Sequence, residues 1–439
     1  SVSVYSLGST FDSTYEDDES NSDDALEGDG SGDGENTATG EASKQSANSS
    51  DQVGGSLGEL QGEDPGAAPG TSTKDSRANT GIGLAQSKLN ASESTTSTQL
   101  GLLSAASAQP GVIAKVEAGS TIVTAGRVDV SAHEAIDAEM NSGQFAAGIA
   151  GVGASVSILN LSSNVRAQLG GSVTAAGAVT VKANGKRVAD MLTIGVQAGF
   201  VGVGAAVTVL NDSSVQGAEV LGSTKIDDAS SILVKATNTQ DLTANTYTLQ
   251  GGVVAVGVNF TRLSADDGNA GTLDTFATIG NDTDIGQTQT VGTVTVEADS
   301  TVDAYAETIG VAVGLAAGGF NFSFVDVTPR VKASLGNDVE MDSTGLVALR
   351  ATANHDATAR LLGVNAGALG VGVSLATATV GTAVTASIGT GFNASIGGLE
   401  LLATHNWGTT DRGAHAYAIS AGGGIVSGQG AVPTANANA

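Results

Sequence analysis

A short pattern of alternating apolar and polar positions recurs six times along the last three quarters of the chain. In most copies the first and third residues are apolar and the second and fourth are polar or charged, which predicts a half-buried β-strand. Successive copies are 51, 53, 62, 53 and 52 residues apart, so we expect a repeat protein. The copies begin at Val128, Val179, Ile232, Val294, Val347 and Leu399.

The alternation also predicts which side chains of these strands face the core. Val179, Val181, Val294 and Val296 occupy the apolar positions and are expected to point inward. The intervening residues, among them Lys182 and Glu297, are expected to point to solvent.

Uncharged blocks of Gly, Ala and Val lie between these strands, for example at residues 191–210 and 309–324. A glycine-rich middle, such as 199–204 or 367–372, is predicted to divide each block into two strands. A last strand then leads into the next copy, as at residues 331–335. The predicted unit therefore has about four strands, and the blocks are expected to be buried on both faces.

The uncharged blocks also admit a transmembrane interpretation, because residues 191–210 are long enough to cross a bilayer as a helix. Their richness in Gly, Val and Thr, and the lack of flanking aromatic belts or of a Lys/Arg excess, oppose it. We therefore expect no membrane span and ascribe the blocks to strands.

One such unit cannot bury its own apolar faces, so neighbouring units must stack, as in a solenoid. The predicted fold is all-β: a repeat β-solenoid, similar to a β-helix, of about six stacked units of about 53 residues. Such a unit forms either one wide coil or two ordinary coils, which would add about 5 or about 10 Å of length. The spacing alone leaves both arrangements open.

The sequence 119–126, Gly-Ser-Thr-Ile-Val-Thr-Ala-Gly, precedes the strand that begins at Val128. It resembles the repeats of filamentous-haemagglutinin-like and leukotoxin-like giant bacterial surface proteins. The match recurs at residues 171–177 and covers roughly residues 112–439. The resemblance implies a β-solenoid rod at the cell surface or outside the cell, with adhesion, matrix or filament roles and no catalytic residues.

Residues 1–7 match residues 155–161, which form the third strand of a unit. Residues 112–126 supply the next strand, so the acidic, low-complexity segment between them reads as a long, largely flexible insertion. A solenoid tolerates such an insertion because closure entropy grows only logarithmically with loop length. The predicted divisions are a strand within residues 1–10, the insertion 11–111 and the repeats 112–439.

The charge of the chain is strongly negative and unevenly placed. There are 45 acidic and 18 basic residues, a net charge of −27, and residues 1–80 alone carry 17 acidic and 3 basic side chains. Such a field repels phosphate backbones, so we expect no nucleic-acid partner. Cysteine is absent, which excludes thiolate catalysis and thiolate metal sites.

The cofactor that the sequence suggests is Ca²⁺, in the acidic sequence 29–36. Oxygen ligands stand at alternate positions and Gly34 stands sixth, as in the first half of a calcium loop. The twelfth position is Gly40 instead of Glu, so a solvated acidic loop is the alternative interpretation. The candidate ligands are Asp29, Ser31, Asp33 and Glu35.

A second calcium candidate lies in the longest unit, where Asp282 and Asp284 could share an ion with Asp266 or Asp267 across turns. Aspartate and asparagine side chains in turns commonly bond their own backbone instead.

No enzymatic function is expected. A β-helix lyase or hydrolase clusters carboxylates with Arg or Lys on one coil face, and matching positions of the repeats are expected to hold almost none. The histidines share neither register nor ligand spacing, so we expect them on exposed loops or edges. They are His133, His355, His405 and His415.

Two functions remain. The first is structural: an extracellular rod or filament whose partners are copies of itself. The alternative is an adhesin segment that displays residues 11–111 towards a surface or glycan. Glycan sites generally need exposed aromatic rings, and Trp407 is the single Trp of the chain, which favours the structural function.

Copies of the chain are expected to associate head to tail. Residues 1–7 carry no charge, the chain after Arg412 has none in its side chains, and only Pro433 could block that edge. The last coil of one copy is predicted to stack on the first strand of the next, a contact that builds a filament. The alternative is covalent continuity, in which these residues are one stretch of a longer solenoid with the same packing at the junction. The predicted contact residues are Ser1, Val2, Ser3, Val4, Tyr5, Leu7, Ala435, Ala437 and Ala439.

Overall fold

The structure, a computed structural model, describes residues 2–8, 111–265 and 274–438, and for residues 2–8 it defines the backbone only. These residues form strands and turns without any helix. The strands make two sheets of 16 and 6 strands, all paired in parallel. The predicted all-β fold is confirmed, and the parallel sheets are compatible with a β-solenoid. The described part of the chain contains no helix of the length and apolarity needed to span a bilayer.

Each repeat adds one strand to each position of a stack. Val128 lies beside Val179, which lies beside Ile232, so residues one repeat apart are neighbours on adjacent strands. The same register continues from Ile232 to Val294 and on to Val347. A repeat therefore forms one wide coil, here called a rung, which adds about 4.8 Å. The alternative of two coils per repeat is excluded.

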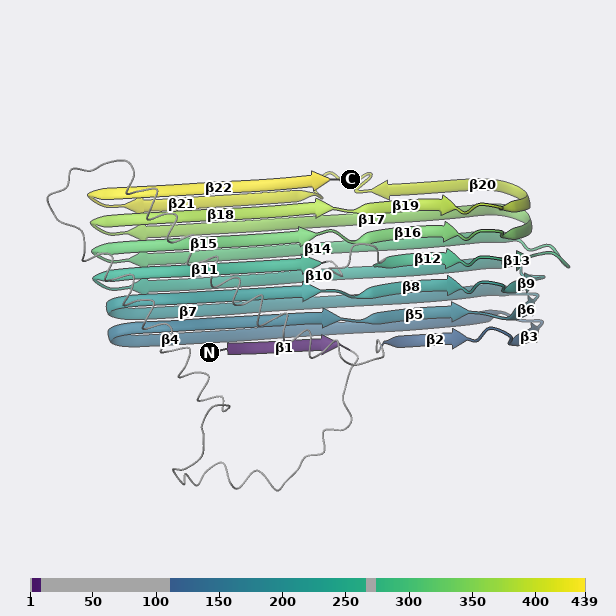
Figure 1. Cartoon of the computed structure of the whole chain (residues 1–439), viewed down its shortest axis with the longest axis horizontal. Helices are drawn as coiled ribbons and strands as arrows, with labels where there is room; N and C mark the ends of the chain where they lie inside the picture. Colours follow the sequence, from purple (N-terminus) through teal and green to yellow (C-terminus); the bar gives the residue numbers. More distant parts are fainter. Residues whose placement is uncertain (1, 9–110, 266–273, 439) are drawn as a thin grey trace, which may run out of the picture. The chain divides into compact units, whose positions relative to one another are not determined.

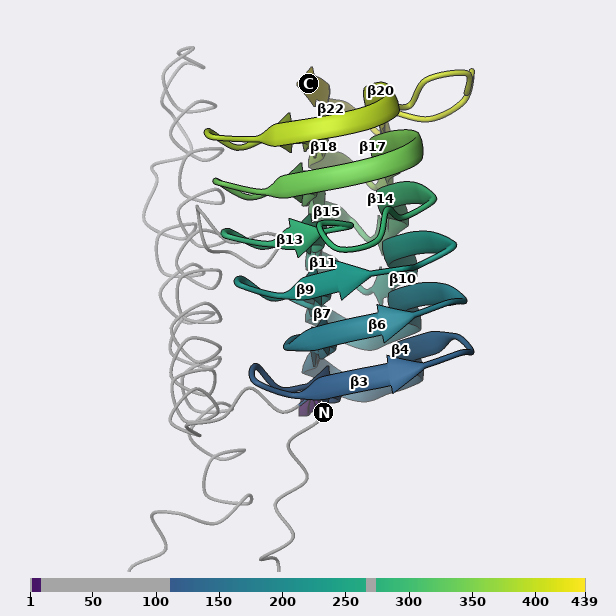
Figure 2. The ribbon, with the colours of Figure 1, turned by 90° about the vertical axis from the view of Figure 1, so that its right-hand side faces the viewer.

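A rung contains four kinds of strand (Figure 1). A base strand leads to a short corner strand. A long strand then runs to the opposite end, where the chain reverses in an arch, and a return strand runs back. Figure 2 looks onto the corner strands, which lie one above another.

The base strands are β2 (Val112–Val116), β5 (Asn164–Leu169), β8 (Val215–Val220), β12 (Thr275–Ile279), β16 (Arg330–Leu335) and β19 (Ala383–Ile388). The corner strands are β3 (Thr121–Thr124), β6 (Ser172–Ala175), β9 (Lys225–Asp227), β13 (Asp284–Ile285) and the first residues of β17 (Glu340–Ala366) and β20 (Asn393–His405). The long strands are the first parts of β4 (Val128–Ser162) and β7 (Ala178–Asp212), then β10 (Ser231–Gly251), β14 (Thr293–Val313), β17 (Glu340–Ala366), and β20 (Asn393–His405) with β21 (Ala414–Gly423). The return strands are β1 (Val2–Gly8), the second parts of β4 and β7, β11 (Val254–Ala265), β15 (Ala316–Val327), β18 (Leu369–Gly381) and β22 (Val426–Asn438).

The arches lie at the glycines that the sequence predicted to divide the uncharged blocks. A Cβ atom on Gly199 would lie 2.3 Å from the carbonyl oxygen of Gly148, and one on Gly367 would lie 2.0 Å from that of Gly314. Stacked arches thus need glycine, because the backbone of one arch meets the backbone of the next.

Two apolar clusters fill the interior. One lies among the base strands, the corner strands and the beginnings of the long strands, and it contains the four valines predicted to face inward, all 0% exposed. The other lies between the long and return strands and includes Leu159, Met191 and Leu210. Lys182 and Glu297, at the intervening positions, are only partly covered, so the predicted alternation is confirmed.

The expectation that the uncharged blocks are buried on both faces is wrong. Their inward residues, such as Met191 and Ala206, are fully buried, whereas outward residues such as Ile194 and Phe200 are exposed. Each described rung places one long strand against one return strand, so each strand has a single covered face.

Strand β1 pairs with the end of β4, with Val2 opposite Val156 and Leu7 opposite Leu161. This is the register that the sequence match gives. Strand β2 pairs with the base strand β5 of the next rung. Residues 9–110 lie outside the described residues, so the proposed insertion stays a prediction.

Candidate functional site

A ladder of hydroxyl groups runs through the space between the long and return strands. Thr208 donates to Thr193 in its own rung at 2.8 Å and lies 2.6 Å from Thr246 in the next rung. Thr261 continues the series, at 2.6 Å from Thr246 and 2.7 Å from Thr308. These bonds supply the partners that buried hydroxyls need. They join the long strand to the return strand within a rung, and they also join each rung to its neighbour.

Next to this ladder, amide side chains fit against a column of glycines. Gln197 and Gln250 reach across from the long strands to Gly204 and Gly257 on the return strands. A Cβ on Gly204 would lie 2.2 Å from Gln197 Oε1, and one on Gly257 would lie 2.5 Å from Gln250 Oε1. Gln250 Nε2 also donates to Gln197 Oε1 at 3.3 Å, along the stack. The amide opposite Gly204 and Gly257 explains why these two positions of the return strands hold glycine.

Arg187 and Asp212 form an ion pair inside the stack. Both side chains are 0% exposed, and Arg187 Nε lies 2.7 Å from Asp212 Oδ2. The guanidinium also donates to Asn238 in the next rung and, at 3.4 Å, to Gln216. Asp212 Oδ1 accepts the backbone N–H of Ser214 at 3.0 Å. These bonds offset part of the large cost of removing two charges from water.

His355 contradicts the expectation of exposed histidines. Its side chain is 0% exposed, with Nδ1 2.6 Å from Thr382 Oγ1 and Nε2 3.0 Å from Ser300 Oγ. Burial lowers its pKa to about 3, and the nearby His405 and Arg412 contribute. The ring is therefore a neutral, hydrogen-bonded part of the core. The inward column that holds Arg187 also holds His355.

The other histidines lie nearer the surface. His133 is exposed and lies 2.9 Å from Asn184 of the next rung. His415 is partly exposed, with Nε2 3.3 Å from Asp356 Oδ1.

Charged residues do occupy matching positions of the repeats, contrary to expectation. Lys235, Glu297 and Arg350 follow one another on the outer face of three successive rungs. Glu297 lies 3.0 Å from Lys235 Nζ and 3.2 Å from Arg350 Nη1, and Arg350 Nε lies 2.6 Å from Glu400. Burial opposes the charge of Glu297, but the two cations outweigh it and lower its pKa. The column pairs opposite charges between rungs and so adds to their cohesion.

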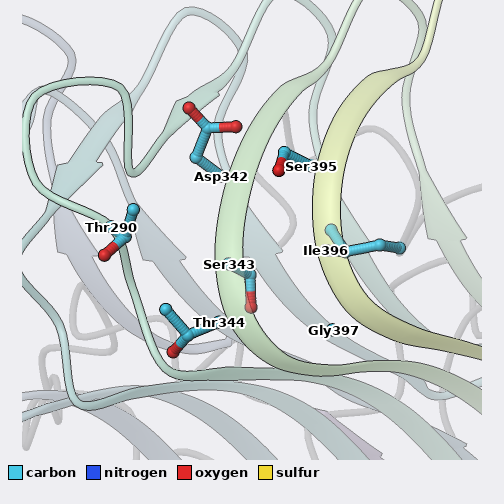
Figure 3. Close-up of a pocket in the computed structure, with 7 residues that line it drawn as sticks. All are labelled: Thr290, Asp342, Ser343, Thr344, Ser395, Ile396 and Gly397. Carbon is cyan, nitrogen blue, oxygen red and sulfur yellow. The ribbon is translucent and has the colours of Figure 1, made fainter.

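A hollow lies at a bulge in β17 (Figure 3), where the pairing with β20 shifts register between Ser343 and Leu346. The hydroxyls of Ser343 and Thr344 donate to the backbone oxygens of Gly292 and Val291. The lining has one carboxylate, that of Asp342, and no basic side chain. It consists of Thr290, Asp342, Ser343, Thr344, Ser395, Ile396 and Gly397.

The calcium candidates receive no support from the geometry. Asp29, Ser31, Asp33 and Glu35 lie outside the described residues, as do Asp266 and Asp267. Asp284 pairs with Lys225 Nζ at 2.8 Å, and Asp282 occupies a turn with a φ of 54°. Among the described residues no group of three or more His, Asp or Glu side chains could hold a metal ion. Calcium binding stays a prediction.

Among the described residues, the strands of the last rung have a partner on one side only. β19 pairs with β16, β20 and β21 pair with β17, and β22 pairs with β18. The other side of each strand offers backbone groups that a further strand could pair with.

The free edge of β22 carries a specific pattern of donors. The N–H of Val426 donates to the oxygen of Ala368 at 2.9 Å, next to β18. In a parallel strand alternate residues bond to opposite sides, so odd-numbered residues of β22 point their N–H and C=O towards the free edge. Ala435 and Ala437 do so, and Pro433 leaves one donor missing there. Ser1 and Ala439, two other predicted contact residues, lie outside the described residues.

Comparisons with known proteins give no match to a family model, a curated protein or a solved structure. The likeness to giant bacterial surface proteins therefore rests on the repeats in the sequence alone.

Proposed function

We propose that this chain is a structural repeat protein, a segment of an extracellular rod or filament made of about six stacked β-solenoid rungs. The observation that carries the proposal is the continuous pairing of equivalent residues in successive rungs. β10, for example, pairs with β7 and β14 over its whole length without a register shift. The extracellular location rests on the resemblance of the repeats to surface proteins.

The bonding along the stack suits a mechanical role. Pulling two rungs apart must break the backbone bonds of the base, long and return strands together with the bonds of the hydroxyl and amide ladders. Each hydrogen bond contributes only about 0.5–1.5 kcal/mol net, but dozens of them act in parallel at one junction between rungs. The adhesin alternative depends on residues 11–111, most of which lie outside the described part.

We propose further that copies associate head to tail through β1 and β22. Continuing the observed register, β1 of one copy would pair with the free edge of β22 of another, with Val2 opposite Val432 and Tyr5 opposite Ala435. Ala435 directs its N–H and C=O towards that edge, as the contact requires.

Flush stacking of two whole copies would meet a conflict. β1 adds a return strand below β4, at the level of the base strand β2 of the first rung (Figure 1). If β2, β3 and β4 of one copy continued the last rung of another, its β1 would take the position already held by β22. The proposed pairing of β1 with β22 therefore joins the two copies through their return strands, and it sets β2, β3 and the long strand of β4 one rung beyond the position that would directly continue the last rung.

The test uses the alternation along β22, in which odd-numbered residues face the free edge and even-numbered residues face β18. Ala435→Pro removes an N–H that faces the free edge and keeps every bond to β18, so it should abolish filaments in negative-stain images at micromolar concentration. Pro433→Ala restores a donor to the free edge and should promote assembly.

Thr434→Pro is the matched control for backbone damage, because it removes a donor that faces β18. It should destabilise β22 itself. Dispersed monomers of the unaltered chain, or filaments that tolerate Ala435→Pro, would contradict head-to-tail assembly through this edge.

A further inference from the structure

The arches present a row of apolar side chains along one edge of the stack. Each arch places one residue after its glycine at the outer surface, and neighbouring arches are bonded, as where Val253 N–H donates to the oxygen of Phe200 at 2.8 Å. We call this row the arch strip. It consists of Ile149, Phe200, Val253, Leu315, Ala368 and Ile425.

Four of the six residues of the arch strip are unusually exposed for apolar side chains, and Val253 and Ala368 are partly exposed. Ile149 is 87% exposed, Phe200 60%, Leu315 63% and Ile425 89%. Flanking residues add to the surface: Phe145 is 73% exposed, and Leu249, Val313 and Leu369 are also exposed. An aromatic side chain has about 150–250 Å² of surface and an aliphatic one somewhat less, so at these exposed fractions the strip and its flanks expose on the order of 1,000 Å² of apolar surface.

An area of this size points to a binding surface. The largest apolar patch of a typical monomer is about 300–600 Å², and each partner in a stable complex buries about 800 Å². Phe200, Val253 and Leu315 also line a shallow hollow on this edge, together with neighbouring glycines. None of the strip residues is charged, in a chain whose net charge is −27. A charged partner would thus find no complementary charge on the strip, and anionic lipid headgroups would be repelled by the chain.

We infer that the arch strip binds the arch strip of a second copy, with the two stacks antiparallel and side by side. A two-fold axis between the arches of Val253 and Leu315 sets these two residues opposite each other. It also sets Phe200 opposite Ala368, and Ile149 opposite Ile425. Phe200 then meets the small Ala368 and Leu315 meets Val253, whereas a parallel arrangement would set Phe200 against Phe200 and Ala368 against Ala368. The antiparallel contact is isologous and closes as a dimer.

This lateral contact is independent of the head-to-tail contact, so it is tested in the Ala435→Pro variant, whose free edge is blocked. Light scattering during gel filtration at micromolar concentration should give the mass of two chains. Phe200→Asp with Leu315→Asp should weaken the dimer at least tenfold, because each buries an unpaired charge at the contact. Val123→Asp is the control: Val123 is 77% exposed on β3, at the opposite end of the rung from the arches (Figure 1).

Cysteine cross-linking tests the orientation, since the natural chain contains no cysteine. A mixture of Phe200→Cys and Ala368→Cys chains should form a disulfide between copies, and Phe200→Cys alone should not. The two positions lie three rungs apart, about 14 Å, so neither one stack nor a head-to-tail pair brings them within the roughly 7 Å limit between Cα atoms.

Three outcomes would overturn the inference. The first is a monomer at every concentration. The second is a dimer that survives the two aspartates. The third is a monomer in which Phe200→Asp makes residues 9–110 newly sensitive to protease, since the strip would then be covered by the chain's own segment.

Discussion

Removing one partner of the buried ion pair should damage the stack far more than removing both. The rung before Arg187 and Asp212 has Ile136 and Leu161 at the same positions, so the chain itself shows which apolar residues fit. Asp212→Leu alone leaves the guanidinium at 0% exposure with only amide partners. Breaking a buried pair in this way costs about 3–5 kcal/mol.

The double variant, Arg187→Ile with Asp212→Leu, should recover most of that loss. Replacing a buried pair by apolar residues of suitable shape is commonly neutral or stabilising by about 1–4 kcal/mol. The coupling between the two sites in a double-mutant cycle should therefore exceed about 2 kcal/mol, well above the few tenths of a kcal/mol expected for independent sites.

Hydrogen exchange is the appropriate assay, because a repeat array need not unfold in a single step. A loss of 3 kcal/mol should speed exchange of the amides of β7 and β10 by roughly 100-fold in Asp212→Leu. The matched control is Asp241→Leu, which removes a carboxylate from an exposed position on β10 and should leave these rates within a few-fold. Unchanged exchange in Asp212→Leu, or a double variant less protected than the single one, would refute the reasoning.

Three further expectations follow from the interior and the last rung. Val181→Asp should disrupt stacking at its rung, because Val181 is 0% exposed and its replacement would bury an unpaired charge; urea unfolding that matched the natural chain would show that the strand register is wrong. The pKa of His355 is lowered in the folded chain to about 3 from an ordinary 6.5, so the unfolded chain binds the extra proton first and stability falls as the pH drops below 6.5. Between pH 6.5 and 5 this loss should reach about 2 kcal/mol, and a His355→Gln chain with the same pH slope would contradict it. Trp407 is 83% exposed in the turn after β20, so iodide should quench its fluorescence freely in dispersed chains, and protected fluorescence there would be unexpected.

The strands could be predicted because a period of two is visible within five residues. The inward positions of Val179 and Val181 follow from that period alone. Every second residue of the long strand in β7, counted from Val179, faces inward, and Arg187 and Gln197 are among them. The alternation therefore also predicts the inward positions of these polar residues. The alternation alone does not, however, single them out, because charged and amide side chains of a half-buried strand usually lie on its outer face. His355 is expected at the surface for another reason: the histidines share neither register nor ligand spacing.

The pairing of Gly204 with Gln197 could not be predicted. It depends on where the arch turns, and a glycine-rich run such as 199–204 fixes that point only to within several residues. A shift of one residue changes which side chain of the long strand meets which residue of the return strand. The exposure of the arch strip depends on the same turn, because it decides which residue stands at the tip.

The number of residues in one rung determines how long a stack a given length of sequence can form. A helix advances about 1.5 Å per residue and a strand about 3.3 Å. Here about 53 residues advance the stack by about 4.8 Å, or roughly 0.1 Å per residue. A span of 1,000 Å would thus take roughly 200 rungs and about 11,000 residues. In such a sequence most residues add to the width of a rung. The length of the stack therefore depends on the number of rungs that are joined end to end.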